Sequence, residues 1–514
     1  MIVVDTTAGQ VAGSAGPGAS HEAGVVRFLG IPYAEAPVGE LRFRAPRPAK
    51  PWSGARGCDD FGYWSPQNPA ATTLSGEVPG AQDEDCLTLN VWTPAADGAH
   101  RPVMVWVHGG GFVGGSGASG MYHGAALAAR GDVVVVTINY RLGVLGFLAH
   151  PDLADPGGAE AGGAAGNWGL LDQVAALAWV RDNIAGFGGD AANVTIFGES
   201  AGAMSVSDLL AMPAATGLFH RAIAQSGPPN AMSMARAEEN ASKLTAGLGV
   251  GSVQSLRQVP VAALLVAQAN VLSQRAAGLP LTPVVDGTSL PAHPLSGIAG
   301  GSAAGVPLLI GTNRDEYKMF IVADPKGRDP DEAILRRRIE RAFAASGEQL
   351  RPDDAIAAYR SIRESAGEAT DPRDLWSAIE SDRLFRIGSI KAAEAQSNHQ
   401  TRTFSYLFVW ESPAMRGALG ACHALEIPFV FGSLGLPGMD RFAGCGAGAE
   451  KLSTDMMDAW LAFARSGDPS HPGIGQWPAY DARRRATMIF GSETAVVDAP
   501  MDQERQVWEA ARQR

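Results

Sequence analysis

Val194-Thr-Ile-Phe-Gly-Glu-Ser-Ala-Gly-Ala-Met204 is the stretch that decides the fold of this chain. Its first four residues are β-branched or aromatic and predict a buried strand, whereas the residues from Ala201 to Leu210 are apolar at helical spacing. A strand that reverses at once into a helix leaves no room for Cβ atoms at the two glycines of Gly198-Glu-Ser-Ala-Gly202. The turn holds Ser200 in strained backbone and exposes its hydroxyl above the sheet. We therefore interpret Ser200 as a nucleophile, with an ordinary Gly/Ser turn as the alternative.

The composition is that of an ordinary globular protein. Of the 514 residues, 46% are hydrophobic and 18% are charged, and the formal net charge is −12. This charge argues against nucleic acid and anionic membranes as partners, because binding to either needs a basic face. The chain does not open on a basic segment followed by an apolar core, and its longest apolar runs are far too short to span a bilayer.

The cysteines argue against a metal site. Cys58, Cys86, Cys422 and Cys445 are never two to four residues apart, so the spacing typical of zinc ligands is absent. We expect free thiols in a cytoplasmic protein, with a secreted protein whose signal has been removed as the alternative. We expect no metal and no cofactor.

Strand and helix patterns alternate along the chain after a small hairpin over residues 1–14. Strands are predicted at Val25–Ile31, Cys86–Trp92, Pro102–Val107, Asp132–Asn139, Ala222–Gln225, Val306–Gly311 and Phe404–Trp410. An amphipathic helix is predicted at Leu170–Ile184 and a long helix at Ala449–Ala464. Most of these strands are nearly continuous in Val and Ile, which favours an α/β fold with a largely parallel sheet buried on both faces.

Two long segments, 232–300 and 328–400, are mostly helical in composition and periodicity. We expect them to cap the carboxyl edge of the sheet, where α/β sheets bind ligands. No repeat or flexible linker interrupts the chain, so we expect a single domain over residues 1–514.

A glycine-rich stretch, His108-Gly-Gly-Gly-Phe112, follows the strand predicted at Pro102–Val107. Three consecutive glycines let backbone N–H groups point into a cavity, and with the N–H of Ala201 they predict an oxyanion hole. A flexible loop or a phosphate cradle is the alternative. A phosphate-binding loop would end in Gly-Lys-Ser/Thr, which is absent here.

A nucleophilic serine needs a base and an acid that orients the base. In α/β-hydrolase sheets the acid and then the histidine follow the serine along the chain. The histidines after Ser200 are His220, His293, His399, His423 and His471. His423 lies in a loop after the strand Phe404–Trp410, whereas most of the others lie in turns or polar stretches typical of solvated histidines. The acid should follow the strand Val306–Gly311, where Asp315 and Glu316 both qualify by position.

Short motifs spread nearly from end to end carry a family resemblance. They are Gly30–Ala34, Leu41–Phe43, Glu84–Leu87, His108–Phe112, Gly166-Asn167 with Leu171–Gln173, Gly198–Gly202, Gln225–Gly227, Gly311–Glu316 and His423–Glu426. By these motifs the chain resembles the type-B carboxylesterases, which include bacterial para-nitrobenzyl esterases, animal carboxylesterases and cholinesterases. The resemblance implies the α/β-hydrolase fold, in which a large mixed central sheet is flanked by helices and helical excursions cap an active-site gorge.

By position, the resemblance implies Ser200 as nucleophile, Glu316 as acid and His423 as base. It implies an oxyanion hole made by Gly110, Gly111 and Ala201. It also places Glu199 beside the site as a second carboxylate and Ser226 as a buried polar neighbour. Candidate walls of the substrate pocket, with plain core packing as the alternative, are Phe112, Trp168, Met319 and Phe320.

Three positions depart from the family pattern. Cys86 matches one half of a disulfide of the animal enzymes, but its partner position holds Ser65. The loop before Cys86 lacks the tryptophan with which cholinesterases bind a quaternary ammonium, so choline esters are not expected as preferred substrates. Tyr317 stands where many relatives have glycine after the acid.

The resemblance and the residues together predict a serine carboxylic ester hydrolase. We expect it to act through an acyl-enzyme on small to medium neutral esters, as a monomer or small homo-oligomer without nucleic acid or membrane partners. One alternative is hydrolysis of aryl carbamates or anilides by the same triad. A second is a non-catalytic cholinesterase-like binding protein, which the retained Ser200, Glu316 and His423 argue against.

Overall fold

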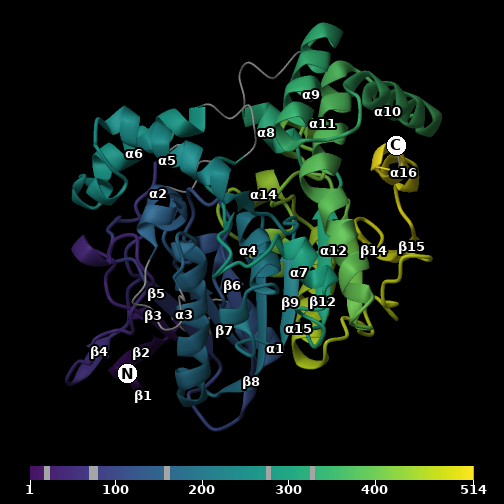
Figure 1. The fold of residues 1–514 in the computed structure, drawn as a ribbon. Helices are drawn as coiled ribbons and strands as arrows, with labels where there is room; N and C mark the ends of the chain where they lie inside the picture. The colour runs from purple at the N-terminus through teal and green to yellow at the C-terminus, as the bar shows by residue number, and fades with distance from the viewer. Residues whose placement is uncertain (17–23, 69–78, 155–162, 274–278, 324–329, 513–514) are drawn as a thin grey trace.

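The computed structural model describes residues 1–16, 24–68, 79–154, 163–273, 279–323 and 330–512. These residues form a 13-stranded sheet in which β4 (Ala55–Gly57) pairs with β2 outside the main order. From one edge to the other, the main order is β1 (Ile2–Thr6), β2 (Gly9–Ala15), β3 (Val26–Pro32), β5 (Thr88–Thr93), β7 (Val134–Ile138), β6 (Arg101–Val107), β8 (Gly189–Glu199), β9 (Arg221–Gln225), β12 (Leu308–Asn313), β13 (Thr403–Phe408), β14 (Ala486–Phe490) and β15 (Ala495–Asp498) (Figure 1).

The sheet is mixed, with a parallel centre. All neighbours from β7 to β14 pair in parallel, so that Val105 of β6 lies between Val136 of β7 and Ile196 of β8. The pairs from β1 to β7 and the pair β14–β15 are antiparallel. All of these parallel strands except β14 overlap strands that the sequence predicted, and the Val-rich strands β6 and β7 are buried on both faces.

Successive residues of β6 face two separate hydrophobic cores. Val105 packs in one core with residues of α3 (Trp168–Asn183), and Trp106 packs in the other with residues of α15 (Ala447–Ser466). Alternate side chains of a strand point to opposite faces, so the helices must cover both faces of the sheet. The helix predicted over Leu170–Ile184 is confirmed as α3. It is not amphipathic as predicted, because it is buried along most of its length and exposes only Arg181 and Asp182 fully.

The two helical excursions are confirmed, but they only partly cap the sheet. At one end of the sheet lie α5 (Met234–Leu248), α6 (Val261–Ser273), α8 (Lys318–Ala323), α9 (Glu332–Ser346), α10 (Pro352–Ala366) and α11 (Pro372–Ser381) (Figure 1). By contrast, α7 (Pro294–Ala299) and α12 (Ile387–Ser397) pack on each other, and α12 lies along β12 and β13. The last helix, α16 (Asp502–Arg512), packs on α10.

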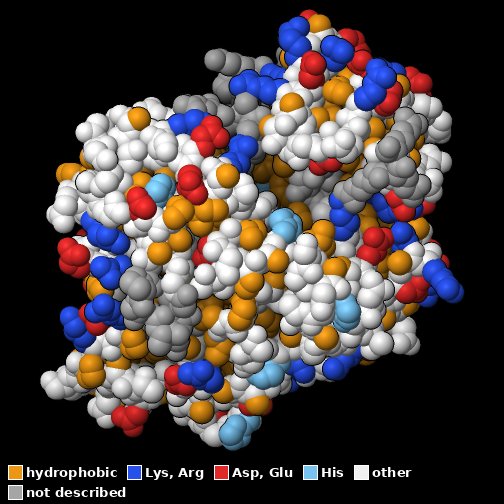
Figure 2. Space-filling view, viewed as in Figure 1, with side chains coloured by type: hydrophobic (Ala, Val, Ile, Leu, Met, Phe, Trp, Pro, Cys, Tyr) orange, Lys and Arg blue, Asp and Glu red, His pale blue; other side chains and the backbone are white. Residues whose placement is uncertain are grey.

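Acidic and basic side chains are interspersed on the viewed face and gather over the helices at the top of the molecule (Figure 2). There, ion pairs from Arg336 to Asp353 and from Arg360 to Glu332 join α9 and α10. Within the ranges given above, no helix combines the length and apolar character that crossing a bilayer requires.

Candidate active site

Ser200 lies at a sharp turn between β8 and α4 (Ala201–Leu209). Its φ of 56° and ψ of −125° belong to a conformation that a non-glycine residue adopts only when its surroundings impose it. A Cβ atom at Gly198 would lie 2.6 Å from the carbonyl oxygen of Val107, and one at Gly202 would lie 2.0 Å from the same oxygen. The Ser200 N–H donates to the carbonyl of Gln225 at 2.9 Å. The glycines therefore permit the turn, and the neighbouring strand β9 helps to fix it.

His423 and Glu316 lie together, although 107 residues separate them. Each follows one of two adjacent parallel strands, β12 and β13. The Nδ1 atom of His423 lies 2.6 Å from Oε2 of Glu316, and both side chains are buried, with residue exposures of 3% and 0%. The other oxygen of Glu316 accepts the N–H of Asn313 at 2.8 Å. Of the two acids that qualified by position, Glu316 is thus the one beside the histidine.

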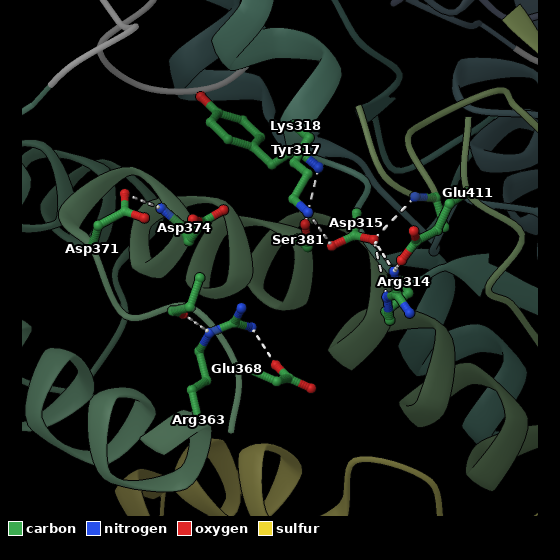
Figure 3. A network of polar contacts seen from close by, with 12 residues as sticks. Arg314, Asp315, Tyr317, Lys318, Arg363, Glu368, Asp371, Asp374, Ser381 and Glu411 are labelled. Carbon is green, nitrogen blue, oxygen red and sulfur yellow. Dashed lines mark hydrogen bonds and ion pairs between the residues drawn. The ribbon is translucent and has the colours of Figure 1, made fainter. Parts of the chain in front are cut away.

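Asp315 belongs to a different network, in which it lies beside Arg314 and Lys318 and Arg314 also reaches Glu411 (Figure 3). It forms ion pairs with Arg314 at 2.8 Å and Lys318 at 3.0 Å, and it accepts the N–H of Ala421 at 3.0 Å. Burial by itself raises the pKa of Asp315, but these two cations hold it below its usual value. Asp315 therefore bonds backbone and an arginine and ties the acid loop to the segment that carries His423.

Tyr317 fits the acid loop without the glycine of the family pattern. Its φ is not positive, so the backbone here does not need glycine. Its N–H donates to Ser381 Oγ at 2.9 Å, and its ring packs on Trp376 and Phe320 with centroid distances of 5.3 and 5.5 Å. The tyrosine thus joins the acid loop to α11.

Glu199 lies on the other side of the histidine ring. Its Oε1 is 3.1 Å from Nε2 of His423, and both atoms are buried. Nε2 forms no hydrogen bond with any described residue, Ser200 included. Hydrogen bonds between catalytic groups often tighten only in the complex with substrate.

The carboxylates around His423 change its proton affinity. Burial by itself lowers the pKa of His423, but the negative charges of Glu199 and Glu316 outweigh burial and raise it. Burial raises the pKa of Glu199, and the charges of Glu426 and Glu316 add to this, while His423 opposes it. The site is therefore built to stabilise an imidazolium, which a base becomes when it accepts a proton.

A third buried carboxylate supports this arrangement. Glu426 accepts hydrogen bonds from Asn313 Nδ2 at 2.7 Å and from Gln225 Nε2 at 3.1 Å, and Trp460 Nε1 donates to Gln225 Oε1 at 3.0 Å. Burial and the charge of Glu316 raise the pKa of Glu426. Gln225, Asn313 and Glu426 lie in motifs that carry the family resemblance, but the sequence predicted no role for them. Their hydrogen bonds join segments that are far apart in the sequence.

The glycine-rich loop meets the serine turn. A Cβ atom at Gly109 would lie 2.7 Å from the carbonyl oxygen of Glu199 and 3.1 Å from Cβ of Ser200. Gly110 and Gly111 have φ values of 112° and 62°, and their N–H groups donate to no other described residue. The N–H of Ala201, in the first turn of α4, also has no partner within its helix. The structure therefore brings the loop that carries Gly110 and Gly111 against the turn that precedes Ala201.

Of the four candidate pocket walls, only one contacts the histidine and the other three lie in buried positions. Phe320 lies against His423 at 5.3 Å between ring centroids. Phe112 packs edge-on against Phe147, Trp168 donates its Nε1–H to Leu148 O, and Met319 lies in a core cluster. All three are buried, which favours core packing over a pocket wall. Sequence reasoning missed a second aromatic ring on the histidine, that of Phe385.

The cysteines carry free thiols, and burial raises the pKa of Cys86, whose neighbour is Ser65, to about 12. The buried hydroxyl of Ser226, a residue with a φ of 55°, has no hydrogen-bond partner among the described residues. Among the residues that the structure describes, no three His, Cys, Asp or Glu side chains lie close enough together to bind a metal ion.

Comparison with known proteins places the chain in a family. A profile of the carboxylesterase family matches residues 1–508. The chain is 39% identical to a para-nitrobenzyl esterase of Bacillus subtilis (strain 168), with 98% of each chain covered, and 36% identical to a phenmedipham hydrolase of Pseudarthrobacter oxydans, with 96% of each covered. It superimposes on a carboxylesterase of Geobacillus stearothermophilus with a TM-score of 0.84 and 41% identity, covering 98% of this chain and 99% of that one. The chain therefore belongs to the carboxylesterase family, and it is a serine carboxylic ester hydrolase with the α/β-hydrolase fold.

Proposed function

We propose that the chain hydrolyses small to medium neutral esters through an acyl-enzyme formed on Ser200, with His423 as base and Glu316 as acid. The observation that carries this proposal is the 2.6 Å contact between Glu316 Oε2 and His423 Nδ1, in a buried site beside the strained serine turn. A carboxylate on Nδ1 fixes the tautomer in which Nε2 is free to accept a proton.

The reaction runs in two halves. His423 Nε2 takes the proton of Ser200 as Oγ attacks the ester carbonyl carbon, and the carbonyl oxygen becomes an oxyanion. The oxyanion collapses, the bond to the alcohol oxygen breaks, and His423 gives its proton to that oxygen. Water then attacks the acyl-enzyme with the same base, which releases the carboxylic acid and restores the serine.

We assign the oxyanion contacts to the N–H groups of Gly110, Gly111 and Ala201. The glycine loop that touches the serine turn supports this assignment. One such donor is worth roughly 10²–10³ in rate. We assign Glu199 to stabilisation of the imidazolium, since its carboxylate is 3.1 Å from Nε2. Phe320 is our candidate for an apolar wall of the substrate site, and neutral esters are proposed over choline esters.

A second candidate substrate class is the aryl carbamates. One relative that matches nearly the whole chain at 36% identity is a phenmedipham hydrolase, which fits this alternative, and the same serine, base and acid would serve hydrolysis of a carbamate. Rates on p-nitrophenyl esters, aryl carbamates and anilides, measured with the same enzyme preparation, show which substrate class the enzyme prefers.

We further propose that residues 1–514 act as a single domain without a cofactor, as a monomer or small homo-oligomer in the cytoplasm. One sheet that takes strands from both ends of the chain supports a single domain. Four free cysteines support a reducing compartment.

Covalent trapping tests the nucleophile. A fluorophosphonate should add its mass to the peptide that contains Ser200, and Ser200→Ala should lose both the label and the turnover. Undiminished labelling of the Ser200→Ala variant would mean that another residue is the nucleophile.

A further inference from the structure

A π-helical turn lies against the ring of His423. Helix α11 continues in helical conformation through the π-helical residues Asp382–Arg386 into α12. Such turns interrupt regular α-helices and are frequent at functional sites. Phe385 on this turn has its ring 4.7 Å from the imidazole of His423, and it stacks on Phe320 with 9° between the ring planes.

The same turn carries a buried ion pair. Asp382 and Arg386 are joined by two hydrogen bonds of 2.6 and 2.7 Å, and their side chains are only 3% and 7% exposed. The hydroxyl of Tyr359, on α10, donates a further hydrogen bond to Asp382. Buried charges are tolerated only when well partnered, so this cluster fixes the backbone on both sides of Phe385.

Helix α16 completes the cluster from the end of the chain. Trp508 Nε1 donates to the hydroxyl of Tyr359 at 2.7 Å, and Arg386 Nη1 donates to the carbonyl of Met501 at 3.3 Å. The Trp508 ring also packs edge-on against Phe343 of α9 at 5.6 Å. In Figure 1, α16 lies beside α10 at the outer side of the molecule, so the hydrogen bonds join a peripheral helix to the turn on the histidine.

We propose that Asp382 is a positioning residue for ester hydrolysis: it holds Phe385 against the imidazole of His423, and α16 supports it through Trp508 and Tyr359. This inference rests on the role of His423 as base proposed above. It adds a group of residues, remote from the serine, that acts on the reaction through the orientation of the histidine.

The geometry explains why the histidine needs such support. Glu316 contacts Nδ1 of the imidazole and Glu199 lies beside Nε2, so both carboxylates hold ring nitrogens and neither packs on a face of the ring. Phe385 and Phe320 lie against the ring and limit its tilt, which holds Nε2 in one orientation. A misplacement of about 1 Å in a catalytic group can lower a rate roughly 100-fold.

Tyr359→Phe tests the proposal, because it removes one hydroxyl and keeps the ring. Leu335→Ala is the matched control, since Leu335 is buried in the same hydrophobic cluster as Tyr359 and Trp508 but lies on α9. Turnover of p-nitrophenyl acetate is measured per active site titrated with a fluorophosphonate. We expect Tyr359→Phe to lower kcat roughly tenfold, with little change in KM and a shifted acid limb of the kcat profile, whereas Leu335→Ala lowers only the melting temperature.

A double variant tests the route through the phenylalanine. If Tyr359 acts through Phe385, Tyr359→Phe should cause no further loss of kcat in a Phe385→Leu background. A normal kcat and pH profile for Tyr359→Phe, or losses that multiply in the double variant, would overturn the positioning role. His423→Ala separates this outcome from failure of the proposed function: turnover retained in that variant would refute the base itself, and with it the inference.

Discussion

Exchanging each of the two adjacent acids for its amide should separate catalysis from stability. In Glu316→Gln, the oxygen that accepts the Asn313 N–H can remain, so the loop should keep its structure. The group that faces His423 Nδ1 at 2.6 Å loses its charge and can present an N–H instead of an acceptor. The imidazole then loses the partner that fixes its tautomer and stabilises its protonated form.

The cost can be estimated from that contact. Neutralising the acid of a serine triad lowers kcat by roughly 10³–10⁴, which corresponds to about 4 to 5.5 kcal/mol of activation free energy. Asp315→Asn instead removes the charge that partners Arg314 and Lys318 but keeps an oxygen for the Ala421 N–H. We expect this change to lower the free energy of unfolding by about 1–3 kcal/mol and to spare most of the turnover per folded molecule.

The assay is turnover of a p-nitrophenyl ester, normalised to active sites titrated with an organophosphate, beside urea unfolding of each variant. We expect Glu316→Gln to unfold like the wild type and to be nearly inactive. We expect Asp315→Asn to unfold at lower urea concentration and to keep most of its turnover. If Glu316→Gln kept nearly normal turnover while Asp315→Asn lost it without unfolding, the acid would be wrongly assigned.

Three further changes have defined outcomes. Glu199→Gln removes a negative charge that raises the pKa of His423, so the acid limb of kcat/KM should move to lower pH by about one unit or more; an unmoved limb would contradict the coupling. Burial raises the pKa of Asp208, whose Oδ2 has no hydrogen-bond partner among the described residues. Unfolding should therefore become easier as the pH rises above the pKa that this carboxyl has in the unfolded chain. Asp208→Asn should therefore raise the free energy of unfolding at pH 8 by on the order of 1–3 kcal/mol and have little effect near pH 3, as urea titrations would report. Because the proposed mechanism uses neither a metal nor a disulfide, EDTA and dithiothreitol should leave turnover intact; activity lost with EDTA and restored by a divalent ion would refute it.

Local features of the site could be predicted from the sequence because they depend on neighbouring residues. The serine turn needs glycine at two fixed positions, and the strand and helix on either side have clear periodicity. The choice between Asp315 and Glu316 depended on backbone angles that the residues alone did not give, and family position was needed to make it. The late strands β14 and β15 were not predicted, and β15 is a short edge strand with mostly exposed side chains.

Contacts between distant segments were beyond sequence reasoning. An apolar residue such as Phe385 in a helical pattern has the same signature whether it packs in a core or on a catalytic histidine. Trp168 and Phe112 show the converse: the sequence made them candidates for the pocket wall, and the structure places both rings in the hydrophobic core. The π-helical turn that carries Phe385 is contacted by a tyrosine of α10, which a tryptophan of α16 contacts in turn.

The long interval between Glu316 and His423 has a consequence for how the enzyme is made. The two residues meet only when β13 has paired with β12, and parallel strands need the whole connection between them before they can pair. During synthesis the N-terminal part of a chain emerges from the ribosome first, so the segment with Ser200 is released well before the segment with His423. A nascent chain, or a translation product that stops within α9 to α12, thus carries the proposed nucleophile without the proposed base. With these roles, ester hydrolysis is expected only after the segment with His423 has been synthesised and β13 has paired with β12.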